Sequence, residues 1–463
     1  MVRDGRTQIL NVHAPLGPRT PQGRRMLESI SLKNFKSFAT ATIPLAPFTL
    51  IIGANGAGKS NFFDALRLLR AIGEGRSVRD ALEGHALPGA TTATAVAGVR
   101  GGATAITHFL SESPLFSISA TIRDGYSRIR YFVEIDASKY RVVNEELSSS
   151  SHPGSYVFST RPETGPLDQL EDSPVITARF HKVSRGLNPR RDFSPHEFIL
   201  SQFSGRRAES RANEEVADKA REEFSAITPL ELRPEALRQY SPRGRAELGE
   251  HGENFASVVA DLWERANTPQ FRFVNESGKS QLEQFVDTDA RNSMDALRSW
   301  LGEITPRAIT EVLTQQTPTG EVIFAVREEP YEEPIAAPSL SDGTLRFAAL
   351  ALVATAIPGR RALVVEEIEN GINPSRVALL VQMLEQATAD TKVQVIASSH
   401  SPAVLDYTGE RAVESAVVIG WDEQNQSSRP VLIKNLPSFE EIRKHETLGD
   451  LQIEGWLQLA AGM

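Results

Sequence analysis

The chain has 463 residues, of which 40% are hydrophobic and 24% charged, and its formal net charge at pH 7 is −9. This composition can fill a core and is not that of a disordered chain, and the acidic balance excludes a surface that is basic throughout but not a local basic groove. Cysteine is absent, which excludes disulfides and thiolate zinc sites, and no apolar run reaches the roughly 18 residues of a membrane span. We therefore expect a cytoplasmic protein without a membrane partner.

The N-terminal third of the chain shows several clear local patterns. Residues 27–38 begin with the alternation of a strand, and 48–52 form a short apolar run that ends at a glycine. Apolar residues at helical spacing then predict a helix over 60–72. Alternating residues over 116–122 and 128–135, on either side of a polar turn, predict an antiparallel meander.

The middle and the C-terminal third differ in pattern. From about residue 194 to 265 the sequence is helical and charged, with breaks at Pro229, Pro234 and Pro242, and strand-like runs return between 309 and 326. The remainder reads helix, strand, helix, strand over 345–357, 362–366, 375–389 and 393–398. This order is typical of a parallel, doubly wound sheet, so we expect an α/β fold split by an inserted region.

These patterns divide the chain into four parts. Residues 1–25 combine arginines with Pro and Gly and lack the apolar segment of a signal peptide, so we expect a flexible basic tail. Residues 26–145 and 301–463 form the two halves of the α/β domain. Residues 146–300 form an inserted, mostly helical lobe.

A complete phosphate-binding motif lies between the strand at 48–52 and the helix that follows it. The motif G-x-x-x-x-G-K-[ST] is formed by Gly53, Ala54, Asn55, Gly56, Ala57, Gly58, Lys59 and Ser60. The glycines let backbone N–H groups surround phosphate oxygens, Lys59 supplies a cation, and Ser60 supplies a hydroxyl ligand to Mg²⁺. An accidental glycine-rich turn is the alternative, and the complete motif in its proper context argues against it.

An acidic pair ends a second apolar strand. Glu366 and Glu367 follow Ala362–Val365, where α/β folds place their ligands. One carboxylate can hold Mg²⁺ and the next can orient and polarise the attacking water. Taken alone, the pair could equally be a solvated acidic turn, and the phosphate loop elsewhere in the chain favours the catalytic interpretation.

Two weaker signals accompany these motifs. Ser341, Asp342 and Gly343 precede a helix, where a hydroxyl and glycine N–H groups can bind an anion, although a turn that merely caps the helix is the commoner explanation. His400 follows the apolar strand at 393–398, where a neutral imidazole could contact a γ-phosphate or the attacking water. A purely structural histidine is the alternative.

Together these segments resemble the ABC ATPase superfamily, and more narrowly its RecF-like and OLD-like branch of AAA ATPases, related to the SMC ATPases. The resemblance is carried, in the family's order, by ISLKNFKSF, GANGAGKSN, LSDGTLRF, LVVEEIENGINP and SSHSPAVLD. It covers 27–72 and 339–407, whereas the middle is similar only in outline. It implies an ABC-type P-loop ATPase head with an antiparallel β meander and a largely helical insertion.

The resemblance also implies roles for individual residues. Glu366 would hold Mg²⁺ together with Ser60, Glu367 would be the catalytic base, and His400 the switch histidine. The remaining implied roles are ATP contacts by Gly53 to Ser60 and Asn61, base or ribose contacts by Lys36 and Ser37, contacts by Ser341, Asp342 and Gly343 to ATP held by a second subunit, and a D-loop position for Asn373.

The sequence departs from the family pattern at three places. Glu366 stands where Asp is commoner and Asp342 where a second glycine is usual, and Gln202 is the candidate for a Q-loop glutamine that no motif fixes. Without cysteine there is no zinc hook. The segment after His400 lacks the carboxylate set of a two-metal nuclease, so we expect no nuclease in this chain.

Three functions follow from the resemblance. The first is an ATP-dependent homodimer that acts on DNA, in repair or in defence against phage, with DNA contacts by Arg185, Arg190 and Arg191. Interleaved glutamates make a solvated helical face the alternative for that basic cluster. The second is an ATPase switch for a separate effector, such as a nuclease or toxin, and the third, which fits worst, is a transporter subunit.

Overall fold

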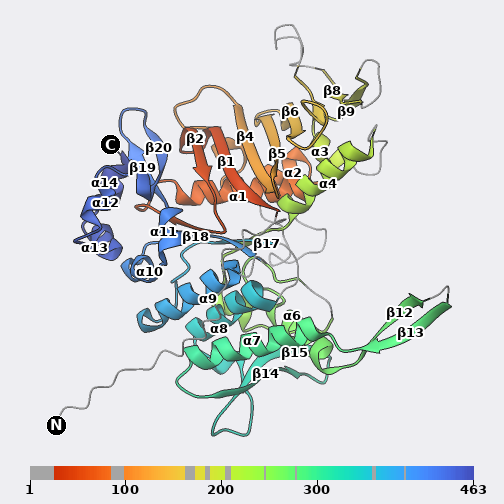
Figure 1. The fold of residues 1–463 in the computed structure, drawn as a ribbon, viewed down its shortest axis with the longest axis vertical. Helices are drawn as coiled ribbons and strands as arrows, with labels where there is room; N and C mark the ends of the chain where they lie inside the picture. The colour runs from red at the N-terminus through yellow and green to blue at the C-terminus, as the bar shows by residue number, and fades with distance from the viewer. Residues whose placement is uncertain are drawn as a thin grey trace.

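The computed structural model describes residues 25–84, 98–161, 173–182, 188–203, 210–244, 247–276, 279–356, 361–389 and 393–462. The predicted basic tail lies outside this part of the chain, apart from Arg25, which opens the first strand. An antiparallel sheet, a parallel sheet and a helical lobe follow one another along the long axis of the molecule (Figure 1). Within the described ranges, no helix is both long and apolar enough to cross a membrane.

The first layer is an eight-stranded antiparallel sheet in the order β2-β1-β4-β5-β6-β7-β8-β9. The predicted meander is confirmed, because β4 and β5 pair from Leu115↔Asp136 to Asp124↔Ser127. One face of the sheet is buried, and there Tyr131 of β5 meets Phe224 of α4 edge to face at 5.3 Å. The strands are β1 (Arg25–Phe35), β2 (Phe38–Pro44), β4 (Leu115–Asp124), β5 (Ser127–Asp136), β6 (Arg141–Ser149), β7 (Phe158–Ser159), β8 (Ile176–Phe180) and β9 (Arg190–Phe193).

The second layer is a six-stranded sheet in the order β10-β17-β18-β3-β19-β20. Its pairs are parallel except for the final hairpin of β19 and β20. The predicted parallel sheet is thereby confirmed. The strands are β10 (Ile227–Leu230), β17 (Arg361–Val365), β18 (Val393–Ser399), β3 (Phe48–Ile52), β19 (Val417–Asp422) and β20 (Ser427–Leu432).

Two hydrophobic cores lie on opposite faces of this parallel sheet. Alternate residues of β17 enter different cores, since side chains alternate between the faces of a strand. Ala362 and Val364 pack with α1 (Lys59–Gly73) and the antiparallel sheet, whereas Leu363 and Val365 pack with α8 and α9. Helix α1 therefore lies between the two sheets.

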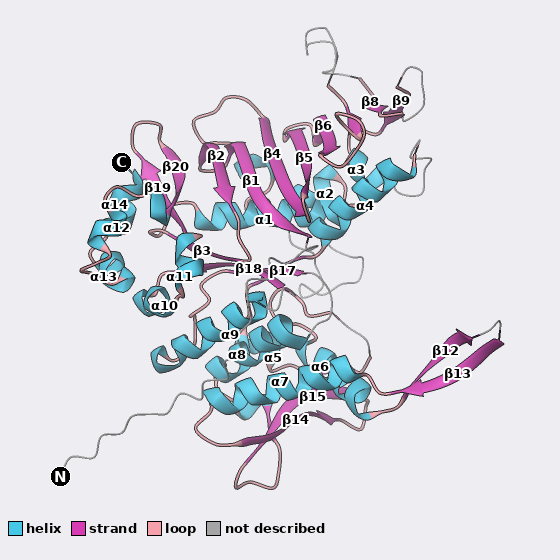
Figure 2. Cartoon of the chain, viewed as in Figure 1, coloured by secondary structure: helices cyan, strands magenta, loops and turns pink. Residues whose placement is uncertain are grey.

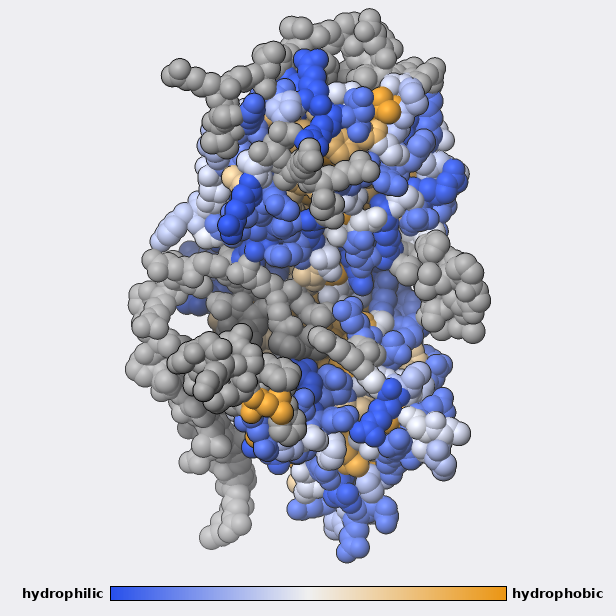
Figure 3. Space-filling view, turned by 90° about the vertical axis from the view of Figure 1, so that its right-hand side faces the viewer, coloured by the Kyte–Doolittle hydropathy of each residue, from blue (hydrophilic) through white to orange (hydrophobic). Residues whose placement is uncertain are grey.

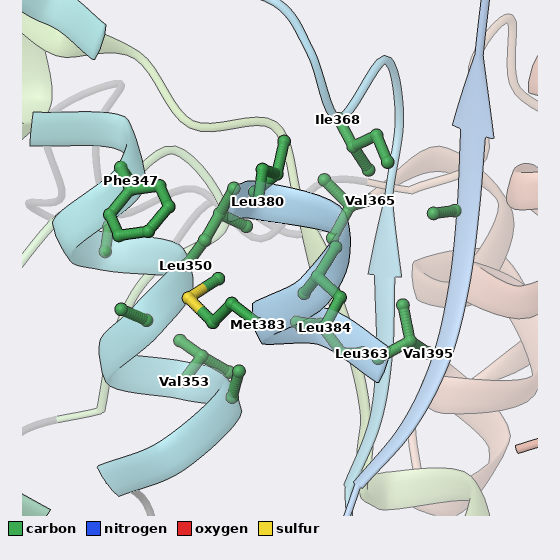
Figure 4. Packing of buried hydrophobic residues seen from close by; sticks show 14 of the residues in the cluster. Phe347, Leu350, Val353, Leu363, Val365, Ile368, Leu380, Met383, Leu384 and Val395 are labelled. Atoms are coloured by element: carbon green, nitrogen blue, oxygen red, sulfur yellow. The ribbon is translucent and has the colours of Figure 1, made fainter. Parts of the chain in front are cut away.

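The second core joins the parallel sheet to the helical lobe. Side chains of α8 (Asp342–Ala351) and its π-helical continuation η5 (Leu352–Ala356) meet those of α9 (Val377–Ala389), which in turn face β17 and β18 (Figure 4). Behind them lie α6 (Phe255–Asn267), α7 (Thr288–Ile304) and a sheet of β11 (Ser241–Pro242), β14 (Ile309–Gln316), β15 (Glu321–Glu328) and β16 (Ile335–Ala336). A separate hairpin of β12 (Gln270–Glu276) and β13 (Lys279–Phe285) projects from this lobe (Figure 2).

Most of the remaining helices are short, whereas α4 has 15 residues and packs against α1 and the buried face of the antiparallel sheet. They are α2 (Val78–Glu83), η2 (Ala103–Ala105), α3 (Ile199–Gln202), α4 (Arg211–Ser225), α5 (Pro234–Leu237), η4 (Ala337–Ser339), η6 (Pro374–Arg376), α10 (Pro402–Tyr407), α11 (Glu410–Glu414), η7 (Ile433–Asn435), α12 (Phe439–Ile442), α13 (Leu448–Ile453) and α14 (Trp456–Gly462).

The middle of the chain differs from the predicted insertion. Two of the predicted boundaries fall inside elements, because residue 145 lies in β6 and residue 300 in α7. The segment between them is mixed rather than mostly helical. It contributes β7, β8 and β9 to the antiparallel sheet and β10 to the parallel sheet, in addition to α3–α7.

Candidate functional site

Glycines shape the loop that joins β3 to α1. Gly56 and Gly58 have φ angles of 81° and 110°, a conformation that other residues rarely adopt. A Cβ atom at Gly53 would lie 2.6 Å from the carbonyl oxygen of Ile419 in β19. The loop therefore turns tightly into the N-terminus of α1, where helix geometry favours a bound anion.

Lys59 is held inside this loop. Its Nζ atom donates to the carbonyl oxygens of Gly53 at 2.7 Å and Ala54 at 2.9 Å, and the residue is 7% exposed. Burial lowers the pKa of Lys59 to about 8, against the opposing effect of nearby carboxylates, of which Glu367 is the strongest. The ammonium group thus lies where the loop can bring it to phosphate oxygens.

Ser60 and Glu366 meet across the interface between α1 and the end of β17. The Ser60 hydroxyl donates to Glu366 Oε2 at 2.9 Å. A hydroxyl and a carboxylate oxygen are ligands that Mg²⁺ accepts beside phosphate oxygens and water. The residues present therefore fit the metal position that the sequence predicts.

A network of charges that the sequence analysis missed surrounds Glu366. Its Oε1 atom lies 3.2 Å from Arg67 Nη1 and 3.0 Å from Arg100 Nη2. The same two arginines pair with Asp64, which is 1% exposed, at 3.3 and 2.9 Å. Ser60, Asp64 and Arg67 lie at i, i+4 and i+7 of α1, a spacing from which the sequence could have placed them on one helix face.

Lys36 and Asn61 lie beside this network. Lys36 Nζ donates to Asp64 at 2.6 Å and to the Arg100 carbonyl at 2.6 Å. The Asn61 amide donates to Ser37 Oγ at 2.8 Å. All three predicted residues thus lie next to the phosphate loop, and their contacts with ATP stay a prediction.

The catalytic candidates converge at the ends of neighbouring strands. Because β18 lies between β17 and β3, His400 lies between the acidic pair and the phosphate loop. His400 Nε2 is 3.8 Å from Glu367 Oε1, and both line a pocket of about 480 Å³ with Asn55, Glu369 and Asn370. Glu367 has a φ angle of 51°, and its N–H donates to Ser398 Oγ at 3.0 Å.

The environment of His400 favours its neutral form. Burial, followed by the charge of Lys59, lowers the pKa of His400 below its usual 6.5, and Glu367 and Glu369 oppose this only in part. The backbone N–H of His400 donates to Glu369 Oε1 at 2.8 Å, while Glu369 Oε2 is buried without a hydrogen-bond partner among the described residues. Glu369 is therefore a further functional candidate, which sequence reasoning missed.

The signature residues, which are Ser341, Asp342 and Gly343, lie at the N-terminus of α8, on the face of the parallel sheet opposite α1. Ser341 caps the helix and accepts the Thr344 N–H at 3.2 Å. A Cβ atom at Gly343 would lie 2.6 Å from the carbonyl oxygen of Gly371, so this glycine permits close contact with the loop that follows the acidic pair. Arg346 strengthens that contact by donating to the Asn370 carbonyl at 2.9 Å.

Asn373 and Gln202 have partners within their own turns. Asn373 caps η6 by accepting the Ser375 N–H at 3.0 Å. The Gln202 amide donates to the carbonyls of Ser194 and Glu197, both at 3.0 Å, and Ser194 donates back to it. These bonds hold Gln202 in its loop, and the Q-loop role considered from the sequence stays a prediction.

Two of the three predicted DNA contacts lie at one edge of the molecule. Arg190 and Arg191 are in β9, the strand at the opposite end of the antiparallel sheet from β2 (Figure 1). Arg190 is exposed, whereas Arg185 lies outside the described residues. The coloured residues on this side of the molecule are mainly hydrophilic, with apolar side chains in small separate groups (Figure 3).

The phosphate loop, the acidic pair and His400 thus lie at the C-terminal ends of three neighbouring strands of a parallel sheet, with an antiparallel sheet beside it. This architecture defines an ABC-type P-loop ATPase head. The chain belongs to the family described as "AAA domain, putative AbiEii toxin, Type IV TA system", whose model matches residues 48–406. No curated protein matches the chain.

Solved structures of SMC head domains are similar to this chain over most of their length. A SMC head bound to the C-terminal winged-helix domain of ScpA has a TM-score of 0.45 and 10% identity, and the match covers 88% of this chain and 97% of that one. The SMC head of Thermotoga maritima has a TM-score of 0.39 and 12% identity, and the match covers 88% of this chain and 99% of that one. The SMC head from Pyrococcus furiosus, bound to the C-terminal domain of ScpA, has a TM-score of 0.44 and 13% identity, and the match covers 90% of this chain and 100% of that one.

Proposed function

We propose that the chain binds ATP with Mg²⁺ at the phosphate loop, hydrolyses it to ADP and phosphate, and associates head to tail with a second copy around the bound ATP. The observation that carries this proposal is the convergence of Lys59, Glu367 and His400 at adjoining strand ends. Two such copies would act in DNA repair or in defence against phage.

The residues divide the work of hydrolysis as follows. Lys59 and the N-terminus of α1 bind the triphosphate and offset its charge. Ser60 and Glu366 would hold Mg²⁺, which neutralises charge on the phosphate oxygens. Glu367 orients a water and takes its proton as the water oxygen bonds to the γ-phosphorus and the bond to ADP breaks. Neutral His400 donates or accepts a hydrogen bond at the γ-phosphate side of the same pocket.

A single solution experiment tests the proposal. Glu367→Gln removes the base, which we expect to slow turnover on the order of 10²- to 10⁴-fold while ATP stays bound. Its mass, measured by light scattering with ATP and Mg²⁺, should be that of a dimer. Lys59→Ala is the matched control and should stay monomeric under the same conditions. A Glu367→Gln chain that stays monomeric at saturating ATP would contradict the dimer.

The alternative is an ATPase switch that regulates a separate effector without binding DNA. The family description favours it, because it refers to a toxin–antitoxin system. A short duplex DNA added to the ATP-bound dimer separates the two. Salt-sensitive retention that is lost on charge reversal of Arg190 and Arg191 supports action on DNA. A dimer that ignores DNA supports the effector switch.

A further inference from the structure

An acidic side chain lies within the segment that we propose to contact the ATP of a second copy. Asp342 follows Ser341 in the first turn of α8, and its side chain is 59% exposed. A carboxylate at a helix N-terminus is favourable for the helix, but it repels any phosphate brought to the same turn. We call the residues that would contact the ATP of a second copy, Ser341, Asp342 and Gly343, the half-site of α8. Because this half-site contains Asp342, it needs a compensating positive charge.

Arg238 supplies that charge from a different segment of the chain. It is the C-cap residue of α5, which packs against α8. Its Nη2 atom lies 2.5 Å from Asp342 Oδ1 and donates to the Leu340 carbonyl at 2.8 Å. One guanidinium group thus holds the residues immediately before and after Ser341, which leaves the Ser341 hydroxyl and the first turn of α8 between its two contacts.

Solvent limits what this pair contributes to the stability of the fold. The Arg238 side chain is 28% exposed and that of Asp342 59% exposed, and ion pairs at such positions contribute little to the free energy of folding because solvent screens them. A second arginine of the same segment, Arg233, pairs with Glu231 at 3.0 Å, and both of these side chains are about half exposed. What distinguishes Arg238 is that its partner belongs to the signature.

We propose that Arg238 is a positioning residue of the half-site formed by α8. It fixes the Asp342 carboxylate to one side of the turn and neutralises its charge, so that Ser341 and the N–H groups of α8 can receive a triphosphate held by a second copy of this chain. The inference rests on the proposed head-to-tail dimer. It explains how a signature segment that contains the carboxylate of Asp342 can bind the triphosphate of ATP.

The test measures dimerisation and ATP binding separately. In the Glu367→Gln background, sedimentation over a protein concentration series with ATP and Mg²⁺ gives the dimer dissociation constant. A fluorescent ATP analogue at low protein concentration gives the affinity of the monomer. Arg238→Gln should weaken dimerisation on the order of 10- to 100-fold, the effect expected of one uncompensated charge a few ångströms from a phosphate, with monomer ATP affinity unchanged.

Two further variants make the result specific. Adding Asp342→Asn to Arg238→Gln should restore most of the lost dimerisation, because no carboxylate then needs compensation. Arg233→Gln, the matched control, should behave as the parent. Unchanged dimerisation in Arg238→Gln, or a loss that Asp342→Asn does not restore, overturns the inference alone. A parent chain that stays monomeric with ATP overturns the proposed dimer and the inference together.

Discussion

We expect the buried cation of the phosphate loop to make the proposed ATP affinity depend on pH above neutrality. In the free protein, burial lowers the pKa of Lys59 to about 8, so the side chain loses its proton as the pH rises through this value. The phosphates of ATP favour the charged form and therefore raise the pKa of Lys59 in the complex. Binding then takes up a proton, and affinity must fall as the pH rises.

The pKa sets the size of this effect. At pH 9 a group with a pKa of about 8 retains its proton in roughly one molecule in eleven, so ATP affinity should fall about tenfold from its value near pH 7, or about 1.4 kcal/mol. If Lys59 had the ordinary lysine pKa of 10.5, ATP affinity would hardly change between pH 7 and 9. His400 does not contribute, because its lowered pKa keeps it neutral throughout this range.

Two measurements check this prediction. Titration of a fluorescent ATP analogue between pH 7 and 9.5 gives the affinity, and calorimetry in buffers of different ionisation enthalpy counts the protons taken up, which should approach one at pH 9. Lys59→Arg is the control, because a guanidinium stays charged over the whole range. A flat affinity profile in the parent protein, or an equal slope in the Lys59→Arg variant, would refute the reasoning.

Three further predictions concern other parts of the molecule. Gly343→Ala should lower the free energy of unfolding by about 1–3 kcal/mol, seen in urea melts, because its methyl group would collide with the Gly371 carbonyl; an unchanged midpoint would contradict that close contact. Glu369→Gln should lower kcat roughly tenfold or more with unchanged ATP affinity, because it weakens the hydrogen bond from the His400 N–H that positions this histidine. An equal change in ATP affinity would instead indicate a binding role for Glu369. Burial raises the pKa of Glu145 to about 7. The free energy of unfolding of the wild-type protein should therefore fall by up to about 3 kcal/mol between pH 4.5 and 7, relative to that of the Glu145→Gln variant. Parallel pH profiles of the two proteins would count against this.

The parts of the fold that the sequence predicts are those with local patterns. The phosphate loop, α1 and the alternation from α8 to β18 depend on contiguous motifs and on helical or strand periodicity. By contrast, β10 spans four residues, includes Pro229 and pairs with β17 alone at the edge of the sheet. A proline is tolerated at an edge, but only the folded chain shows where that edge lies.

The same distinction holds within the site. Glu366, Glu367 and His400 follow apolar strands, so their places at strand ends could be predicted. Arg100 could not, because it reaches Glu366 from an irregular segment and no spacing relates it to the acidic pair. The partner of Asp342 is likewise fixed by tertiary packing.

The position of β3 has a consequence for synthesis of the protein. This strand, which carries the phosphate loop, lies between β18 and β19, which the ribosome makes near the end of the chain. The Gln394 carboxamide joins the same distant parts, since it bonds Leu27 across 367 positions. A nascent chain therefore carries the loop long before either neighbouring strand exists to hold it. The proposed binding of ATP would stabilise only a chain that is almost finished, and intermediates would have to stay soluble without it.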